Sequence, residues 1–117
     1  MSTPIRIRSA GRDDVAELAR LLSAAGQSLA PDEALARLAR LEDTGLDQVL
    51  VAEAASGLLG LLALHMQPVQ LHRPGPAARV SVLVAEGPEA RAALLDAAAD
   101  LARAAGAAVL EGDITNN

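Results

Sequence analysis

The chain has 117 residues, of which 51% are hydrophobic, yet it contains no Phe, Tyr, Trp or Cys. This length fits one domain with its own hydrophobic core, so we expect a single domain over residues 1–117. The absence of cysteine excludes disulfides, thiolate nucleophiles and zinc fingers. The formal net charge of −5 and the lack of aromatic rings that stack on bases argue against nucleic acid as a partner.

The first residues alternate between apolar and charged side chains. Ile5 and Ile7 fall on one face and Arg6 and Arg8 on the other, which predicts a half-buried strand over residues 4–9. This pattern differs from the apolar segment of a signal peptide, and no apolar run approaches the roughly 20 residues of a membrane span. We therefore expect a cytoplasmic protein that does not contact a membrane.

Two helices are predicted next. Asp13 and Asp14 suit the positive end of a helix, and leucines at helical spacing extend that helix over about residues 12–25. The second helix opens at Pro31 and ends at Gly45. Its apolar stripe is predicted to contain Leu35, Leu38 and Leu41. Both helices need a sheet to cover.

Three strands are predicted after the helices. Residues 48–53 and 58–66 form two apolar runs joined by a short turn, which predicts an antiparallel hairpin. A segment with three prolines follows, and residues 78–85 then have the pattern of a buried, central strand.

The last two predicted elements form a crossover. A long Ala-rich helix begins after Gly87 and ends at Gly106. Its inward face is predicted to contain Leu94, Leu95, Ala98, Leu101 and Ala105. A final strand over residues 107–114 should lie parallel to the strand at 78–85, because a helix connects the two. The fold class is therefore α/β (α+β), with a mixed sheet and the order β-α-α-β-β-β-α-β.

This order of elements resembles the first part of the GNAT fold of acetyl-CoA-dependent N-acetyltransferases. Local stretches resemble the same family along most of the chain, namely residues 5–10 with Asp13-Asp14, 50–53, 60–65, 72–80, 93–98 and 104–106. In the family a further helix and one or two strands follow the fifth strand. The resemblance is therefore to a truncated, GNAT-like member without the C-terminal helix and strands.

The resemblance implies where a cofactor would lie. In the family, acetyl-CoA occupies the gap where the fourth and fifth strands separate, and its pantetheine amides pair with the backbone of the fourth strand. Acetyl-CoA, if the chain uses a cofactor at all, would then pair with Leu83, Val84 and Ala85. The family binds the diphosphate at a helix start through backbone N–H groups of a loop with the pattern R/Q-x-x-G-x-G/A.

The corresponding segment, residues 86–92, reads EGPEARA and does not have that pattern. Pro88 has no N–H, and Glu89 places a carboxylate in the first helical turn, where a diphosphate would meet like charge. Arg91 is the remaining cation that can reach a phosphate, with a solvated or ion-paired helix residue as the alternative. Asn116 resembles an Asn that follows the family's fifth strand, with a frayed terminal residue as the alternative.

The sequence identifies no catalytic residue and no metal site. Ser81 stands where this branch of the family has an acid, and the family's catalytic tyrosine lies in a segment that this chain lacks. His65 and His72 are candidates for a general base or a metal pair, but no carboxylate spacing around them suggests a ligand set. We therefore interpret both histidines as surface residues.

Three functions follow from these patterns. The altered loop and strand favour a catalytically impaired acetyltransferase-like module that acts through self-association or a protein partner. An active acetyl-CoA-dependent N-acetyltransferase, alone or completed by a partner subunit, is the first alternative, and a sensor of a small ligand or acyl group is the second. The apolar strand at residues 107–114 leaves a C-terminal sheet edge, so a homodimer or a protein partner is expected to cover it.

Overall fold

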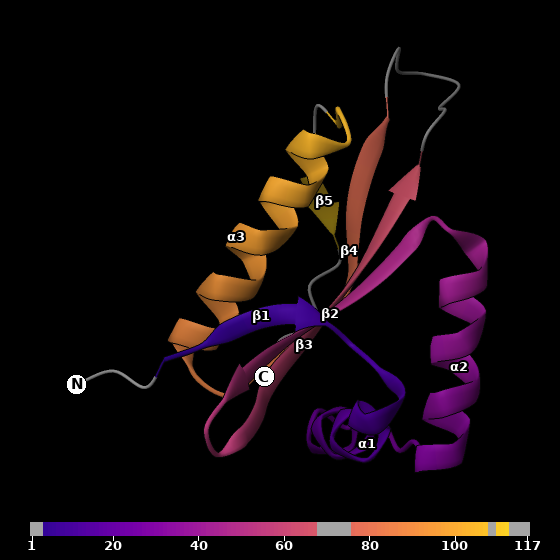
Figure 1. Ribbon diagram of the computed structural model, residues 1–117, viewed down its shortest axis with the longest axis vertical. Helices are drawn as coiled ribbons and strands as arrows, with labels where there is room; N and C mark the ends of the chain where they lie inside the picture. The colour runs from indigo at the N-terminus through magenta and orange to yellow at the C-terminus, as the bar shows by residue number, and fades with distance from the viewer. Residues whose placement is uncertain (1–3, 68–75, 108–109, 113–117) are drawn as a thin grey trace.

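The computed structural model describes residues 4–67, 76–107 and 110–112, and its elements follow the predicted order (Figure 1). In chain order they are β1 (Arg6–Ser9), the 3₁₀ turn η1 (Arg12–Asp14), α1 (Val15–Ala24), α2 (Pro31–Thr44), β2 (Asp47–Ala54), β3 (Gly57–Gln67), β4 (Ala77–Ala85), α3 (Pro88–Ala104) and β5 (Leu110–Gly112). Within these ranges, no helix is both long and apolar enough to cross a membrane.

The five strands form one mixed sheet in the order β1-β2-β3-β4-β5. The first four strands are antiparallel, and β5 runs parallel to β4 after the α3 crossover, which confirms the α+β prediction. Strands β2 and β3 meet at a two-residue turn between Ala54 and Gly57, as predicted for a hairpin. The predicted strand at 107–114 is described only over residues 110–112, because residues 108–109 and 113–114 lie outside the described ranges.

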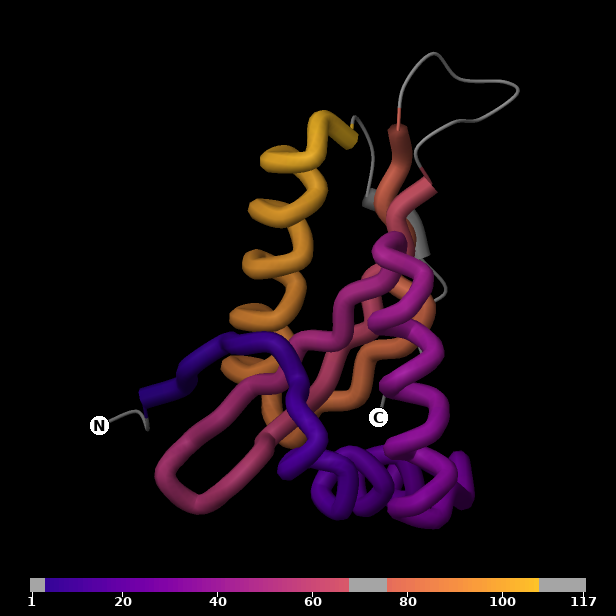
Figure 2. Tube along the Cα trace, turned by 45° about the vertical axis from the view of Figure 1, so that its right-hand side comes forward, coloured from indigo at the N-terminus to yellow at the C-terminus, as the bar shows by residue number. Residues whose placement is uncertain are grey.

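Two aliphatic cores lie on opposite faces of the sheet. Figures 1 and 2 show α3 on one side of the sheet and α1 with α2 on the other. The core beneath α3 consists of Leu50, Ala52, Leu62, Leu64, Ala78, Val80, Leu83, Ala90, Leu94, Ala98 and Ala102. The core beneath α1 consists of Leu18, Leu21, Val51, Leu58, Leu61 and Val84.

Two predicted core positions are wrong. Leu35 of α2 is 37% exposed, and the buried positions of this helix are Ala34 and Leu38, which lie one turn apart on the face toward the sheet. Ala105 follows the last residue of α3 and is exposed, whereas Ala102 is buried. In both helices the buried face is centred on a small residue that leucine spacing alone does not reveal.

Gly60 of β3 lies where β4 and α3 both approach that strand closely. A Cβ atom built on Gly60 would be 2.7 Å from the Val84 carbonyl oxygen, 3.0 Å from Leu94 Cδ1 and 3.2 Å from Ala85 Cα. The first and last of these neighbours are backbone atoms that cannot rotate away. The missing side chain therefore sets how closely the end of β4 and α3 pack on β3.

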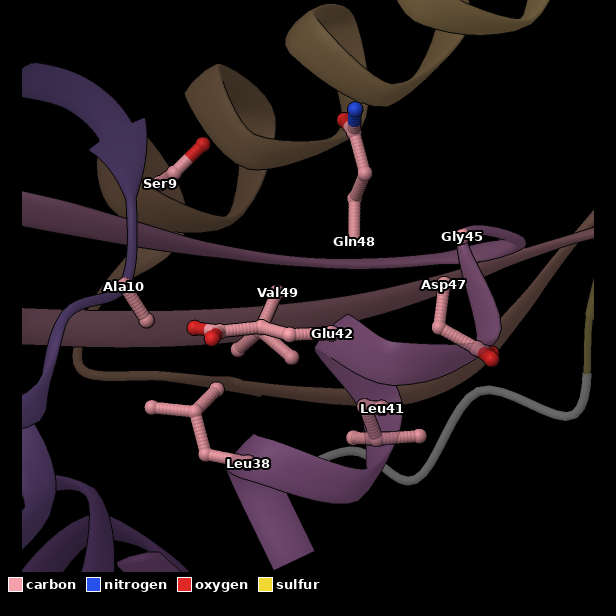
Figure 3. Close-up of a pocket in the computed structure, with 9 residues that line it drawn as sticks. All are labelled: Ser9, Ala10, Leu38, Leu41, Glu42, Gly45, Asp47, Gln48 and Val49. Carbon is pink, nitrogen blue, oxygen red and sulfur yellow. The ribbon is translucent and has the colours of Figure 1, made fainter.

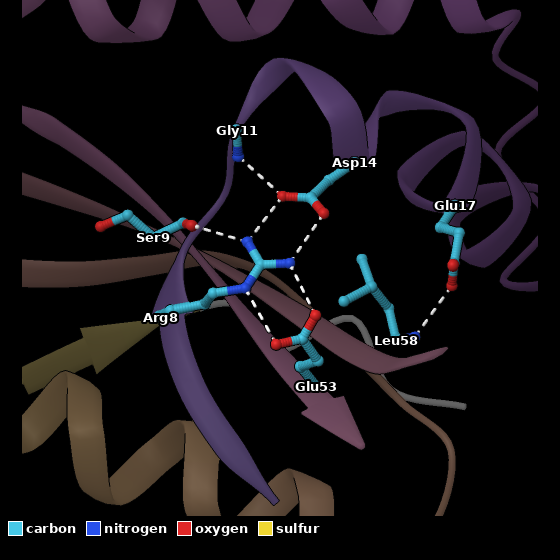
Figure 4. A network of polar contacts seen from close by, with 7 residues as sticks. All are labelled: Arg8, Ser9, Gly11, Asp14, Glu17, Glu53 and Leu58. Carbon is cyan, nitrogen blue, oxygen red and sulfur yellow. Dashed lines mark hydrogen bonds and ion pairs between the residues drawn. The ribbon is translucent and has the colours of Figure 1, made fainter. Parts of the chain in front are cut away.

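A polar network around Arg8 joins β1, β2 and the start of α1 (Figure 4). The Arg8 guanidinium donates two hydrogen bonds to Asp14, with N–O distances of 2.8 and 2.9 Å, and two to Glu53, with distances of 3.1 and 3.3 Å. Asp14 also accepts the backbone N–H of Gly11 at 2.7 Å. Because the Asp14 side chain is only 10% exposed, this carboxylate depends on Arg8 for its charge partner.

Asp14 has a second role besides its predicted position at the start of a helix. Asp13 and Asp14 lie in η1 directly before α1, as the sequence predicts, but the Asp14 side chain pairs with Arg8 across the turn. The hydrogen bonds from Arg8 lower the pKa of Asp14, burial opposes this shift, and the Gly11 N–H adds to it. Arg8 also lowers the pKa of Glu53. The ion pair therefore stabilises the charged form of both acids.

A second set of polar contacts holds α1 on the hairpin. A carboxylate oxygen of Glu17 accepts the Leu58 N–H at 2.8 Å, and Arg20 donates to the Leu58 carbonyl oxygen at 2.9 Å. Arg20 also pairs with Glu86, just before α3, at 2.8 Å. The first helix is thus tied to the beginning of β3 and to the loop that follows β4.

We expect Gly60→Ala to destabilise the fold by about 1–3 kcal/mol, because the added methyl group must displace backbone atoms of β4. Urea unfolding should show a lower midpoint. Gly11→Ala is the matched control, since its Cβ would meet only Asp14 Oδ2, at 3.8 Å, and its φ of −123° suits alanine. A Gly60→Ala variant as stable as this control would contradict the close β3–β4 packing.

We expect Arg8→Met to cost about 2–3 kcal/mol of unfolding free energy at pH 7, because it leaves the Asp14 carboxylate without its cation. The folded-state pKa of Asp14 is depressed, so its pairing stabilises the fold above the unfolded pKa of about 3.9 and is lost as the pH falls below it. The stabilities of wild type and variant should therefore converge in acid.

The control for the Arg8 experiment is Arg37→Met, which removes the exposed ion pair between Arg37 and Glu33 on α2. We expect this change to cost at most about 0.5 kcal/mol, with no comparable convergence in acid. Urea unfolding between pH 7 and pH 3 measures both variants. Equal losses for Arg8→Met and Arg37→Met would show that the Arg8 network does not stabilise the fold.

Candidate functional site

The second half of β4 has one edge that no described strand covers. β5 pairs with Ala78, Arg79 and Val80 at the beginning of β4. Residues 83–85 pair with β3 on one side and with no strand of the described ranges on the other. An uncovered strand edge presents backbone N–H and C=O groups that an extended ligand can pair with.

The three residues predicted to pair with pantetheine lie on this edge. The Leu83 side chain is fully buried beneath α3, the Val84 side chain is buried on the opposite face, and Ala85 is partly buried. Their side chains thus belong to the two cores, and only their backbone is placed to meet a ligand. This arrangement fits the predicted mode of binding, and binding itself stays a prediction.

A β-bulge marks the point where the uncovered edge begins. Ala63 of β3 is opposite Val82 and the next residue, Leu64, is opposite Val80, so Ser81 is the extra residue of β4. Ser81 is exposed, and its hydroxyl donates to the Ala63 carbonyl oxygen at 3.2 Å. Bulges redirect side chains and interrupt pairing next to binding sites. Here the bulge follows Val80, the last residue of β4 that pairs with the described part of β5.

The loop at the far end of this edge is closed by internal contacts. The Glu86 N–H donates to the Leu59 carbonyl oxygen at 2.7 Å, and the Glu86 carboxylate pairs with Arg20 at 2.8 Å. Pro88 is the first residue of α3, and Arg91 is partly buried at the end of its first turn. The described loop therefore has one acid where the resemblance expects a diphosphate, with Arg91 one turn away.

An apolar cavity of about 170 Å³ lies between α1, α2 and the sheet. Leucine, alanine and valine side chains form most of its wall, and Gln27 and Arg37 are its polar residues. Its lining residues are Leu18, Leu22, Gln27, Leu29, Ala34, Arg37, Leu38, Leu41, Val49, Leu61, Ala63 and Val82. Since Ala63 and Val82 flank the bulge, this cavity ends at the beginning of the uncovered edge of β4.

A second, polar hollow of about 280 Å³ adjoins the apolar cavity and shares Leu38, Leu41 and Val49 with it. It lies between the end of α2, the beginning of β2 and the residues after β1 (Figure 3). Figure 3 shows the Glu42 side chain extending from α2 toward Ala10. The carboxylates of Glu42 and Asp47 give this hollow a negative charge that suits a cationic ligand.

The structure places His65 beside a carboxylate that sequence spacing did not reveal. His65 Nδ1 and Asp47 Oδ1 are 2.8 Å apart, and the other Asp47 oxygen accepts the Thr44 hydroxyl at 2.6 Å. His65 is at the surface, as interpreted from the sequence, with its side chain 37% exposed, but it has a carboxylate partner that the sequence analysis did not identify. The register of the β2–β3 hairpin could have revealed this pair, because Asp47 and His65 are direct partners on the two strands.

The other predicted site residues lie apart from this pair. Residues 83–85 form one continuous strand edge, and Arg91 lies on α3 beyond the loop. His72 and Asn116 lie outside the described residues. The described cofactor residues are thus a contiguous backbone edge on β4 and one cation in the first turn of α3.

Neither a family model nor a curated protein sequence matches the chain. Solved structures match its fold. A GNAT family acetyltransferase from Staphylococcus aureus has a TM-score of 0.83 at 13% identity, over 96% of this chain and 87% of the other. A transcriptional regulator from Bacillus halodurans has a TM-score of 0.83 at 14% identity, over 94% and 81%. An aminoglycoside N-acetyltransferase in complex with CoA has a TM-score of 0.81 at 12% identity, over 97% and 78%.

These likenesses show that the chain has the fold of the GNAT acetyltransferases, as the resemblance in the sequence predicted. In this chain the uncovered edge of β4, the bulge and the apolar cavity form the candidate site.

Proposed function

We propose that the chain binds an acyl-CoA along the uncovered edge of β4 and transfers the acyl group to a primary amine. The observation that carries this proposal is that, within the described ranges, β5 pairs with β4 only as far as Val80, so residues 83–85 have β3 on one side and no described strand on the other. A pantetheine arm carries amides that can pair with such an edge. The CoA complex of a structural neighbour supports CoA as the ligand class.

The apolar cavity supplies a place for the acceptor. It ends at Val82 and Ala63, beside the bulge, so an amine held there would be near the thioester end of a pantetheine arm on β4. Its aliphatic wall suits an amine on a small hydrocarbon group, and the adjoining acidic hollow attracts positive charge. Holding the two reactants together in this way supplies much of the rate gain that acyl transfer needs.

The loop before α3 weakens binding at the diphosphate end. Glu86 in the loop and Glu89 in the first turn of α3 place two carboxylates at this end, and Arg20 is paired with Glu86. Like charges close together raise the free energy of the complex. The pantetheine arm should therefore contribute more to affinity than the diphosphate does.

We expect calorimetric titration to show saturable binding of acetyl-CoA and competition by S-acetylpantetheine. Glu86→Gln should tighten acetyl-CoA binding about fivefold, or about 1 kcal/mol, because it removes a negative charge and releases Arg20. The same change should leave the affinity for S-acetylpantetheine, which has no diphosphate, unaltered.

Asp96→Asn is the matched control for the titration. It removes one carboxylate from an exposed position of α3, more than two turns beyond the loop, and should change acetyl-CoA affinity less than twofold. The lack of saturable heat with acetyl-CoA at millimolar concentration would rule out the proposed function. Equal effects of Glu86→Gln and Asp96→Asn would place the diphosphate elsewhere.

The second candidate function is association without catalysis, in a chain whose catalytic site is impaired. It is favoured by the position of β5, which is the last strand of the sheet and pairs, within the described ranges, with β4 alone. The outer edge of such a strand can pair with another strand. A second copy of the chain satisfies this edge symmetrically, and a partner protein can satisfy it with a strand of its own.

Sedimentation velocity tests this association. If β5 pairs with a second copy, the weight-average sedimentation coefficient should rise from monomer to dimer as protein concentration increases through the micromolar range. A clean monomer up to about 0.5 mM would contradict self-association and would restrict this candidate to a different protein as partner.

A further inference from the structure

His65, Asp47 and Thr44 form a chain of hydrogen bonds where the end of α2 meets β2 and β3. The Asp47 side chain is 14% exposed and the His65 side chain 37% exposed, so the carboxylate is sheltered and the imidazole reaches solvent. Thr44 donates to one carboxylate oxygen, and the other lies 2.8 Å from His65 Nδ1. Each oxygen of the Asp47 carboxylate therefore has a hydrogen-bond partner.

This geometry defines the chemistry of the imidazole. An ionised carboxylate only accepts hydrogen bonds, so Nδ1 carries the proton and Nε2 presents its lone pair. The carboxylate also stabilises the imidazolium that forms when Nε2 takes up a proton. An imidazole oriented by a sheltered acid, with its second nitrogen available, is the arrangement of a general base.

The pair lies beside the proposed acceptor site. His65 is two residues beyond Ala63 on the same face of β3, about 7 Å along the strand, and Ala63 lines the apolar cavity at the bulge. Asp47 lines the acidic hollow that adjoins this cavity. Among the described residues, the charged neighbours of His65 are Asp47 on β2 and Arg79, its partner on β4, with Glu42 of α2 in the same hollow as Asp47.

We infer that His65, oriented by Asp47, is the general base that removes a proton from the acceptor amine. This inference rests on the proposed function. Ser81 stands where the resembling family has an acid, and a hydroxyl is too weak a base for the task. In this chain the base would therefore lie on β3, oriented by an acid on β2, and not on β4, where the resembling family has its acid.

The reaction balances as follows for an ammonium acceptor and an acetyl thioester. One proton passes from the ammonium to His65 Nε2, directly or through one water, and the freed lone pair attacks the thioester carbonyl carbon. The carbon–sulfur bond then breaks with its electron pair on sulfur. One of the two protons on the acylated nitrogen then passes to the thiolate, directly or through solvent, the amide keeps the other, and His65 returns its proton to solvent.

The test uses the full chain with acetyl-CoA and n-butylamine, measuring release of the CoA thiol between pH 6 and pH 10. We expect His65→Gln to lower kcat/KM at pH 7 by about 10²-fold or more, with unchanged affinity for acetyl-CoA. Asp47→Asn should lower it at least about tenfold, because the amide N–H of Asn can donate to Nδ1 and favour the tautomer with its proton on Nε2, and because a neutral amide does not stabilise the imidazolium. As the pH approaches the pKa of the amine itself, about 10, the His65→Gln rate should approach that of wild type.

Gln67→Ala is the matched control, since Gln67 lies two residues further along the same face of β3. We expect it to change kcat/KM less than about twofold. An unaltered pH profile in His65→Gln would overturn the assignment. So would a wild-type chain that binds acetyl-CoA but does not acetylate n-butylamine, and in that case CoA binding would stand. Failure to bind acetyl-CoA at all would instead refute the proposed function.

Discussion

The Arg8–Asp14 ion pair is the contact on which the arrangement of this fold depends. A core without aromatic residues packs through many small aliphatic contacts. The energies of such contacts differ little between alternative placements of the helices on the sheet. The bidentate pair is directional, and it fixes the turn by which the chain leaves β1 and enters α1. Glu17 and Arg20 extend this control by tying α1 to the beginning of β3.

The placement of α1 and α2 in turn produces the candidate acceptor site. The apolar cavity lies where the two helices rest on the sheet with Ala34 and Leu38 inward, and Ala63 and Val82 beside the bulge of β4 line it. The other half of the site is backbone. Leu83 and Val84 commit their side chains to opposite cores, so the uncovered edge of β4 needs no special side chain to pair with an extended ligand. Binding through backbone groups is compatible with a chain that contains no Tyr and no Cys.

The sequence predicted the elements well because each has a local cause. Alternation of Ile and Arg, first-turn acids and prolines, and glycines after helices act within a few residues. The errors at Leu35 and Ala105 arise because a helix is buried along the face that meets its neighbours, and that face is set by tertiary packing. Hairpin register was predicted only in outline, so the partnership of Asp47 and His65 was missed.

By itself, the sequence determined the order and type of the elements, their likeness to the GNAT fold, and the absence of thiol and aromatic chemistry. Only the tertiary structure decided where the polar groups meet. Arg8 and Glu53 are 45 residues apart in the chain and His65 and Asp47 are 18 apart, so strand pairing brings each pair together. Local propensities act over one or two turns, and contacts across such separations depend on the register of the whole sheet.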